Sequence, residues 1–270
     1  MKLPRISIGP HRVSKMIIGG NPYSGISHHS PAKSKEMENY YTSAQIMRDL
    51  REAERCGIDT VLARADRHIM RVLNEYRGAG GKIQWIAQTA KRNEYADLID
   101  HIRLIARYQP IAIYQHGGTT DQLYDEGKLE SLRDALALIR ELGYAAGIGT
   151  HDPRILKHCY HEGFDVDFYV CALYNHTRRP EMYLPADRDA AIAAIQAVHL
   201  PVIAIKVLAA GRTEPVSAFS FTLDRIKPID AIAVGMDTNG RPELISDNVT
   251  LVGNLINSID SPRTDERSTS

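Results

Sequence analysis

The chain has 270 residues, of which 43% are hydrophobic and 24% are charged, a composition typical of a globular protein with a sizeable core. Its 33 Lys and Arg residues balance its 33 Asp and Glu residues, so the sequence predicts no basic surface for nucleic acid. No apolar run approaches the roughly 20 residues of a membrane-spanning helix, and the opening MKLPRISIGPHRVSK lacks the apolar stretch of a signal peptide. We therefore expect a cytoplasmic protein that acts on a small molecule. Its oligomeric state is left open.

The predicted elements begin with a small hairpin across Gly9 and Pro10. Eight short runs rich in β-branched or aliphatic residues then predict strands, at 15–20, 59–64, 83–89, 111–116, 145–151, 166–174, 202–209 and 230–237. Several of these runs are apolar on both faces, as strands buried on both sides must be.

Amphipathic segments separate the strands. Residues 43–57 open with Ser43 as a candidate N-cap and close at Gly57, and residues 126–143 put their leucines on one face. Further helices are expected over 186–201 and 241–259. Strand and helix alternate eight times, which is the count that closes a TIM barrel.

We therefore predict an α/β fold with one domain, a single (β/α)8 TIM barrel over residues 1–260 with an N-terminal β-hairpin. Residues 261–270 are predicted to form a polar C-terminal tail. An open, doubly wound sheet is the alternative fold.

Polar side chains follow almost every predicted strand. In a TIM barrel the strand ends and the loops after them form the active site, so these side chains are expected to meet at one mouth. Any one of them alone would more often be a hydrogen-bonded structural residue. Lys206 interrupts an otherwise apolar run and must reach polar partners or lose its proton, because burying an unpaired charge is costly.

Seven segments, in chain order, resemble an aldo-keto reductase. They are HRVSKMIIGG, GIDT, IAIYQHGGTTD, AAGIGTHDPRIL, VCALYN, VIAIKVLAAGR and VGMDTNGRPELISDN, and they span nearly the whole chain. The resemblance implies a barrel that binds a nicotinamide cofactor. It also implies four residues for hydride transfer: an Asp, a Tyr that protonates the carbonyl, a Lys and a His.

The catalytic set departs from that family. Asp59 and His116 match the Asp and the His, but Arg64 stands at the Tyr position and Gln88 or Thr89 at the Lys position. A general acid of tuned pKa is therefore missing.

The cofactor contacts depart as well. Thr150 and His151 stand where the family has a Ser-Asn pair, and Cys171 stands where it has a Gln. Asp237 is expected to repel a ribose 2′-phosphate. The loop 208–212, LAAGR, could still approach a phosphate with help from Arg212. We therefore expect a divalent metal as the cofactor in preference to NAD(P).

Three functions remain open. The first is an isomerase, epimerase or lyase that moves a proton next to the carbonyl of a keto-sugar or other hydroxy-carbonyl compound, with a metal or an Arg polarising that carbonyl. The second is an atypical NAD(P)-linked oxidoreductase in which His116 is the acid and Lys206 replaces the missing Lys. The third is a catalytically inactive barrel that binds a ligand.

The candidate site residues follow from these hypotheses. The candidate catalytic residues are His116, Lys206, Arg64, Asp59 and Asp66. The candidate substrate-binding residues are Asn21, Gln88, Tyr174, Asn175 and Arg212. Imidazoles suit a divalent metal, and the candidate ligands are His151, His116, His68 and His29.

Overall fold

The chain was analysed as a computed structural model that describes residues 3–91, 94–174 and 182–260. A β-hairpin comes first, with β1 (Arg5–Ile8) antiparallel to β2 (His11–Ser14). Gly9 turns the chain between them with a φ of +53°, and a Cβ there would lie 2.8 Å from the Cβ of Ala145. Glycine is therefore required at this turn both for its backbone angle and for its close packing.

Eight parallel strands form a closed barrel in which β10 pairs with both β9 and β3. They are β3 (Met16–Gly19), β4 (Thr60–Arg64), β5 (Gln84–Gln88), β6 (Ala112–Gln115), β7 (Ala145–Thr150), β8 (Phe168–Ala172), β9 (Val202–Ile205) and β10 (Ala231–Gly235). Each lies within a predicted run, so the TIM barrel is confirmed and the open sheet is wrong. The predicted tail 261–270 lies outside the described residues.

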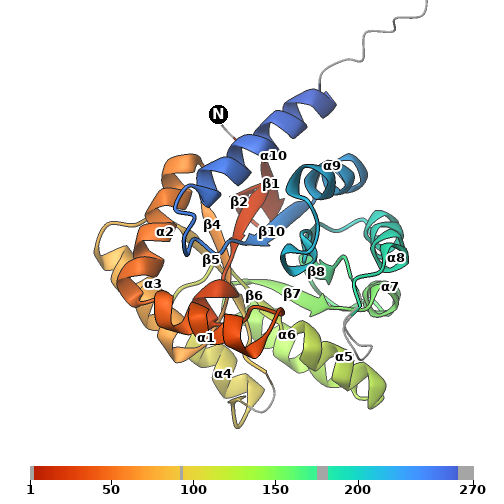
Figure 1. Cartoon of the computed structure of the whole chain (residues 1–270). Coiled ribbons are helices and arrows are strands. Elements are labelled where there is room, and N and C mark those ends of the chain that lie inside the picture. Colours follow the sequence, from red (N-terminus) through yellow and green to blue (C-terminus); the bar gives the residue numbers. More distant parts are fainter. Residues whose placement is uncertain (1–2, 92–93, 175–181, 261–270) are drawn as a thin grey trace, which may run out of the picture.

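Helices surround the barrel (Figure 1). They are α1 (Pro31–Tyr40), α2 (Ser43–Cys56), α3 (Arg67–Gly78), α4 (Leu98–Ala106), α5 (Gly117–Asp125), α6 (Leu132–Glu141), α7 (Pro153–His161), α8 (Pro185–Ala197), α9 (Pro215–Arg225) and α10 (Leu244–Asp260). Short 3-10 turns add η1 (Pro22–Ser24), η3 (Leu129–Ser131) and η4 (Ala209–Gly211). None of the helices in the described part of the chain is long and apolar enough to span a membrane.

Two helical predictions need correction. The N-cap of α2 is Thr42, whose side chain accepts the N–H of Gln45, and Ser43 is the first helical residue. The predicted segment 126–143 is helical only from Leu132, after η3. A helix that was not predicted, α5, begins directly after His116.

Buried residues form two layers. One lies between the barrel and the helices, and the other fills the barrel interior. The interior layer includes Ile17, Ile86 and Phe168 from the strands, together with Ile6 and Ile8 of the hairpin. The hairpin therefore closes the N-terminal end of the barrel.

Asp59 lies at this closed end, because it comes directly before the first residue of β4. Its carboxylate accepts the backbone N–H of Ser14 at 2.8 Å and forms an ion pair with Arg5 at 2.6 Å. The catalytic role predicted for Asp59 is therefore wrong, since active-site residues of a TIM barrel lie at the other end of the strands. Asp59 instead fastens the hairpin to the barrel.

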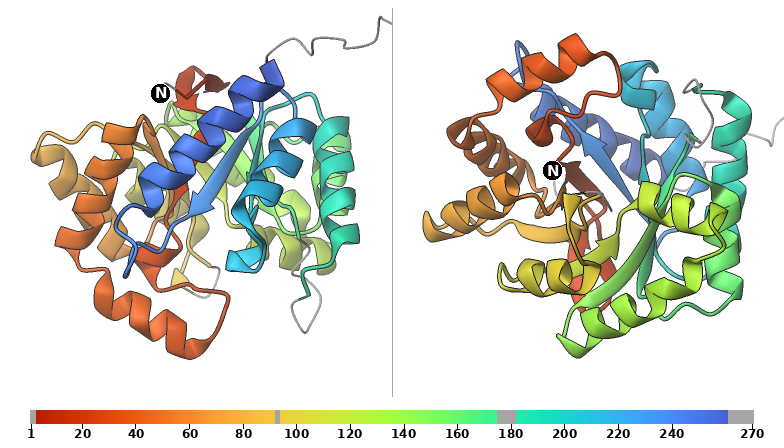
Figure 2. Two further views of the ribbon diagram at one scale, coloured as in Figure 1. Left: turned by 45° about the horizontal axis from the view of Figure 1, so that its top comes forward. Right: turned by 90° about the horizontal axis from the view of Figure 1, so that it is seen from below.

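Helix α1 lies at the end of the barrel opposite the hairpin (Figure 2, left). It is inserted between β3 and α2 and reaches the loop after β10. Lys33 of α1 forms an ion pair with Asp237 at 2.7 Å, and Glu36 accepts a hydrogen bond from the Asn239 amide at 2.6 Å. Helix α1 is thus fastened at the rim of the barrel mouth (Figure 2, right).

Candidate active site

A cavity of about 1210 Å³ opens among the carboxyl ends of the barrel strands. Its walls come from the ends of β3 to β7, β9 and β10 and from the loops after them. Seven residues singled out from the sequence line it: Asn21, His29, Arg64, Gln88, His116, His151 and Lys206. The polar strand ends therefore meet in one cavity, which is large enough for a small-molecule ligand.

Asp66 and His68 do not line this cavity. Asp66 is the N-cap of α3, where it accepts the N–H of Ile69 at 2.8 Å and the hydroxyl of Ser24 at 3.0 Å. His68, in the first turn of α3, is exposed. Both line a separate cleft beside η1 and the start of α2. The predicted roles of Asp66 as a catalyst and His68 as a metal ligand are therefore corrected: one caps a helix and the other faces outward.

Tyr174 and Arg212 also lie outside the lining. Tyr174 is buried with its ring centroid 5.6 Å from that of Tyr183, and the guanidinium of Arg212 lies 4.4 Å from the same Tyr183 ring. Arg212 also donates to the carbonyl of His28 at 3.0 Å. These predicted substrate contacts instead hold neighbouring loops in place. Asn175, the remaining one, lies outside the described residues.

His116 caps the start of α5. Its Nδ1 accepts the backbone N–H of Thr119 at 3.3 Å, so the proton of the neutral ring lies on Nε2. Burial lowers the pKa of His116 to about 3. This low value also includes smaller contributions from nearby groups, in order His151, Lys91, Arg64 and Lys206. His116 is therefore a neutral hydrogen-bond donor at neutral pH.

His151 is oriented by a carboxylate. Its Nδ1 lies 2.8 Å from Oδ2 of Asp121, a side chain only 8% exposed, which also accepts the hydroxyl of Thr150 at 2.5 Å. Because Nδ1 donates to Asp121, the basic lone pair of the ring lies on Nε2. A Cβ on Gly117 would lie 3.1 Å from this ring, so glycine there lets His151 pack against the start of α5, next to His116.

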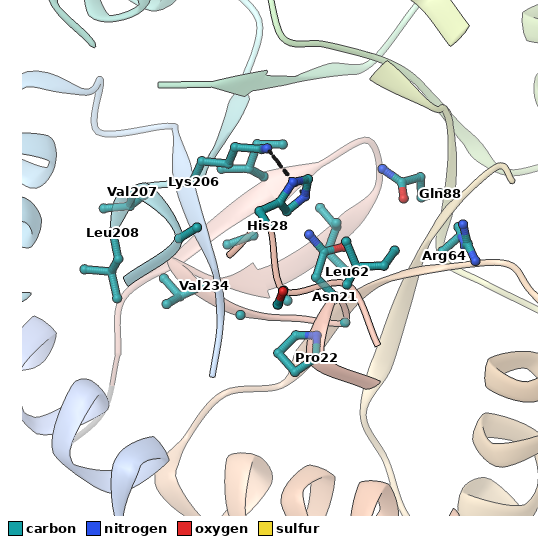
Figure 3. A pocket seen from close by; sticks show the side chains of 18 of the residues that line it. Asn21, Pro22, His28, Leu62, Arg64, Gln88, Lys206, Val207, Leu208 and Val234 are labelled. Atoms are coloured by element: carbon teal, nitrogen blue, oxygen red, sulfur yellow. Dashed lines mark hydrogen bonds between the residues drawn. The ribbon is translucent and has the colours of Figure 1, made fainter. Parts of the chain in front are cut away.

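The remaining polar groups lie on two sides of the cavity (Figure 3). On one side Arg64 and Gln88 are register partners at the ends of β4 and β5, and Gln88 donates to the hydroxyl of Tyr114 at 2.8 Å. On the other side Lys206, with a φ of +59°, directly follows β9, and its Nζ lies 3.4 Å from Nδ1 of His28.

Asp121 and Lys91 were not among the predicted site residues, although both line the cavity. Asp121 follows His116 in the sequence, but its role depends on α5, which carries it back toward His151. Lys91 lies beyond the end of β5, at Gln88, and still reaches the cavity. The signal in the sequence for Asp121 was an acidic residue five positions after the strand-end His116.

The four predicted metal ligands do not form one set. His116 and His151 lie together, whereas His29 belongs to the loop before α1 and His68 lies outside the cavity. Across the described ranges, no three His, Cys, Asp or Glu residues are arranged to hold a metal ion. The proposed ligand set is therefore corrected to a pair of histidines with separate hydrogen-bond partners.

A nicotinamide cofactor fits only part of the cavity. The far end is lined by η4 and by Arg241 and Asn248, the latter only 4% exposed, and offers polar groups to a nucleotide. Asp237, expected to repel a 2′-phosphate, is paired with Lys33 and thus partly neutralised. At the end with His116, the lining offers Arg64, Gln88 and Tyr114, and the Tyr114 hydroxyl accepts a hydrogen bond from Gln88.

Comparison with known proteins supports the fold. No protein-family model matches the chain, and no match was found among curated proteins. Two solved structures of proposed aldo-keto reductases from Pseudomonas aeruginosa are 18% and 17% identical, with TM-scores of 0.60 and 0.62. The first match covers 94% of both chains, and the second covers 93% of this chain and 95% of the other.

The N-acetylmannosamine-6-phosphate 2-epimerase of Clostridium perfringens is 15% identical with a TM-score of 0.55, over 77% of this chain and 86% of the other. At these identities the likeness extends to the fold and no further. The chain is thus a divergent (β/α)8 barrel similar in fold to aldo-keto reductases.

Proposed function

We propose that this barrel is an enzyme that moves a proton at the carbon next to the carbonyl of a small hydroxy-carbonyl compound, as an isomerase, epimerase or lyase does. The observation that carries the proposal is the pair of adjacent histidines with opposite roles. His116 is a neutral donor through Nε2, and His151 is a proton acceptor through Nε2. An acid–base pair of this kind is what enolisation requires.

His151 Nε2 takes the proton from the α-carbon, and the C–H electron pair forms a C=C bond. The carbonyl π electrons move to the oxygen, which accepts a hydrogen bond from His116 Nε2–H. For isomerisation, the proton of the α-hydroxyl passes to the enolate oxygen, and His151 returns its proton to the former carbonyl carbon as the former hydroxyl oxygen becomes the new carbonyl. Return of the proton to the original carbon from its opposite face epimerises the substrate. Loss of a leaving group at the β-carbon gives elimination.

The charges around the cavity favour this intermediate. Arg64, Lys91 and Lys206 are close enough to His116 to lower its pKa, so a negative charge that develops on the substrate oxygen is stabilised by the same cations. Asp121 in turn stabilises the imidazolium that forms on His151, as the buried carboxylate of a catalytic triad does. Lys206 contributes from the β9 side.

A nicotinamide-linked oxidoreductase is the second candidate. The far end of the cavity, with Arg241, Asn248 and the turn η4, favours it. A bound nicotinamide would supply the hydride, and His116 Nε2–H would polarise the substrate carbonyl. The missing Tyr and Lys weigh against this reading.

The test is exchange of substrate α-protons with deuterium in D2O, followed by NMR over a panel of keto-sugars and small hydroxyketones without nicotinamide. We expect His151→Gln to slow exchange at least about 100-fold, because general-base catalysis is worth roughly 10²–10⁴-fold. Lys206→Met should also lose most of the rate. His158→Ala is the control, since this residue lies on α7 outside the cavity.

Exchange that appears only when NAD(P) is supplied would favour the oxidoreductase. Full activity in His151→Gln would overturn the proton-transfer proposal.

A further inference from the structure

Arg64 is a partly buried cation with ion pairs to Glu94 and Asp66 and with several N–H donors not used in hydrogen bonds. Its side chain is 17% exposed and lines the cavity. Its one hydrogen bond within the described residues runs from Nη1 to Glu94 at 3.0 Å. Nε is buried without a hydrogen-bond acceptor and lies 3.7 Å from Asp66, which is already engaged as a helix cap. A guanidinium has five N–H donors in a planar fork. With Nε buried beside Asp66 and one Nη1–H given to Glu94, the second Nη1–H and the two Nη2–H groups are the donors left for a ligand.

The contact with Glu94 shows which chemistry fits this guanidinium. Glu94 reaches Arg64 from the segment between β5 and α4, and its side chain is 34% exposed. Glu94 accepts only one N–H of the guanidinium. A carboxylate that faces the guanidinium side-on accepts two parallel N–H···O bonds and is held more strongly. Arg64 therefore binds the Glu94 carboxylate through one hydrogen bond and not through the stronger two-bond geometry.

The surroundings of Arg64 favour an anion as well. Lys91 is exposed, lines the cavity, and has no ion pair to any described residue. The two cations lie on the same part of the wall, because Arg64 ends β4 and Lys91 follows the end of the neighbouring strand β5. The nearby Asp121 is committed to His151 and Thr150.

We propose that Arg64, with Lys91, binds a carboxylate of the substrate, so that the enzyme acts on a small oxo-acid or sugar acid. The reaction assigned to this substrate rests on the proposed function, whereas the binding of the carboxylate by Arg64 does not. Held by Arg64, the carboxylate would lie beside His116, with the adjacent carbonyl toward Nε2–H of His116.

The experiment compares matched pairs that differ only in carboxylate against hydroxymethyl: pyruvate with hydroxyacetone, and 2-oxogluconate with fructose. Binding is measured by calorimetry on the full chain, with inorganic phosphate as a further probe. We expect each acid to bind at least about tenfold more tightly than its neutral partner. Arg64→Gln should weaken the acids about 10- to 100-fold and leave the neutral partners unchanged, the size expected for a charged hydrogen-bonded contact.

Two further variants test whether Arg64 binds the ligand directly or only supports the structure. Glu94→Gln should leave acid binding unchanged or tighter, because it removes a competing carboxylate. Arg71→Gln, at an exposed arginine of α3, is the charge control and should change nothing.

Equal binding within the pairs, or no binding of either acid, would overturn the proposal. So would acid binding that Arg64→Gln leaves intact, or a Glu94→Gln variant as impaired as Arg64→Gln. Phosphate that binds as tightly as the acids would overturn the choice of carboxylate. Acid binding through Arg64 without α-proton exchange would leave this inference standing and overturn the proposed reaction. α-Proton exchange confined to the neutral compounds would leave the proposed reaction standing and overturn the inference that the substrate carries a carboxylate.

Discussion

His116 and His151 take opposite roles because different groups contact their Nδ1 atoms. A backbone N–H donates to Nδ1 of His116, which places the ring proton on Nε2 and disfavours the charged form. A carboxylate accepts from Nδ1 of His151, which leaves Nε2 as the acceptor. The partner of Nδ1, more than the histidine itself, therefore decides which ring donates and which accepts.

The low pKa of His116 predicts a pH-dependent stability. An unfolded histidine binds a proton below about pH 6.5, whereas folded His116, with a pKa of about 3, does not. The stability that neutral His116 allows is therefore complete above pH 6.5 and is lost as the pH falls toward 3, by about 1.4 kcal/mol per pH unit. His116→Asn, which keeps a capping side chain, should lose this slope.

The measurement is urea unfolding between pH 6.5 and pH 4. The single Trp85 is fully buried, so its fluorescence reports unfolding. Identical pH slopes in the wild type and in His116→Asn would show that His116 is not held neutral in the folded protein.

Asp121 predicts an activity effect with little change in binding. Asp121→Asn keeps an oxygen acceptor for Thr150 but no longer stabilises the imidazolium on His151 and can favour the wrong tautomer. We expect α-proton exchange to fall at least about 100-fold while ligand affinity changes little. Asp134→Asn, on the exposed side of α6, is the matched control. A variant at Asp121 with at least half of the wild-type rate would contradict the role of this dyad.

At the scale of elements, the strands were predictable and several helices were not. Apolar runs buried on both faces identify parallel strands, and all eight appear where the sequence places them. Helix α5 begins with Gly117 and Gly118, which disfavour helix formation, so the sequence gives little sign of it. Helix α1 has a weak apolar stripe with Met37 as its buried apolar residue, and the sequence likewise does not predict it.

These missed helices explain the errors in the site. His116 and Arg64 follow from strand ends alone, and both line the cavity. The donor role of His116 and its link to Asp121 require α5, and the cap role of Asp66 requires the start of α3. Asp59 was misassigned because its role came from the family resemblance, although the predicted strand 59–64 already places it at the start of the strand.

The hairpin predicts a stability effect without an activity effect. Asp59→Ala leaves the Ser14 N–H without its acceptor and removes the ion pair to Arg5, at a cost of about 1–3 kcal/mol. Arg5→Met removes only a half-exposed ion pair and should cost less than about 1 kcal/mol. Both should keep normal exchange activity, because Asp59 is remote from the cavity. Loss of activity in folded Asp59→Ala would return this residue to the active site.

At the scale of the whole molecule, segments outside the repeating units are attached at both ends of the barrel. The hairpin fills the N-terminal end with apolar side chains, and α1 lies at the rim of the other end, held by polar contacts. The first attachment is a core interaction, but the second depends on ion pairs and hydrogen bonds that water competes for. Movement beside the cavity is therefore expected first at α1, which contributes Lys33 and Met37 to the cavity wall.

Lys33 is the residue that tests this arrangement. Lys33→Met removes the ion pair to Asp237, a carboxylate whose side chain is only 17% exposed, and should loosen α1 without unfolding the barrel. We expect faster backbone hydrogen exchange in residues 31–40, a KM several-fold higher in the proton-exchange assay, and a free energy of unfolding changed by less than about 1 kcal/mol. Lys35→Met is the matched control, because Lys35 lies on the same helix but is 69% exposed and pairs only with Glu38 of α1. If the two variants exchange hydrogen at the same rate and share one KM, then the Lys33–Asp237 pair does not hold α1 at the rim of the mouth.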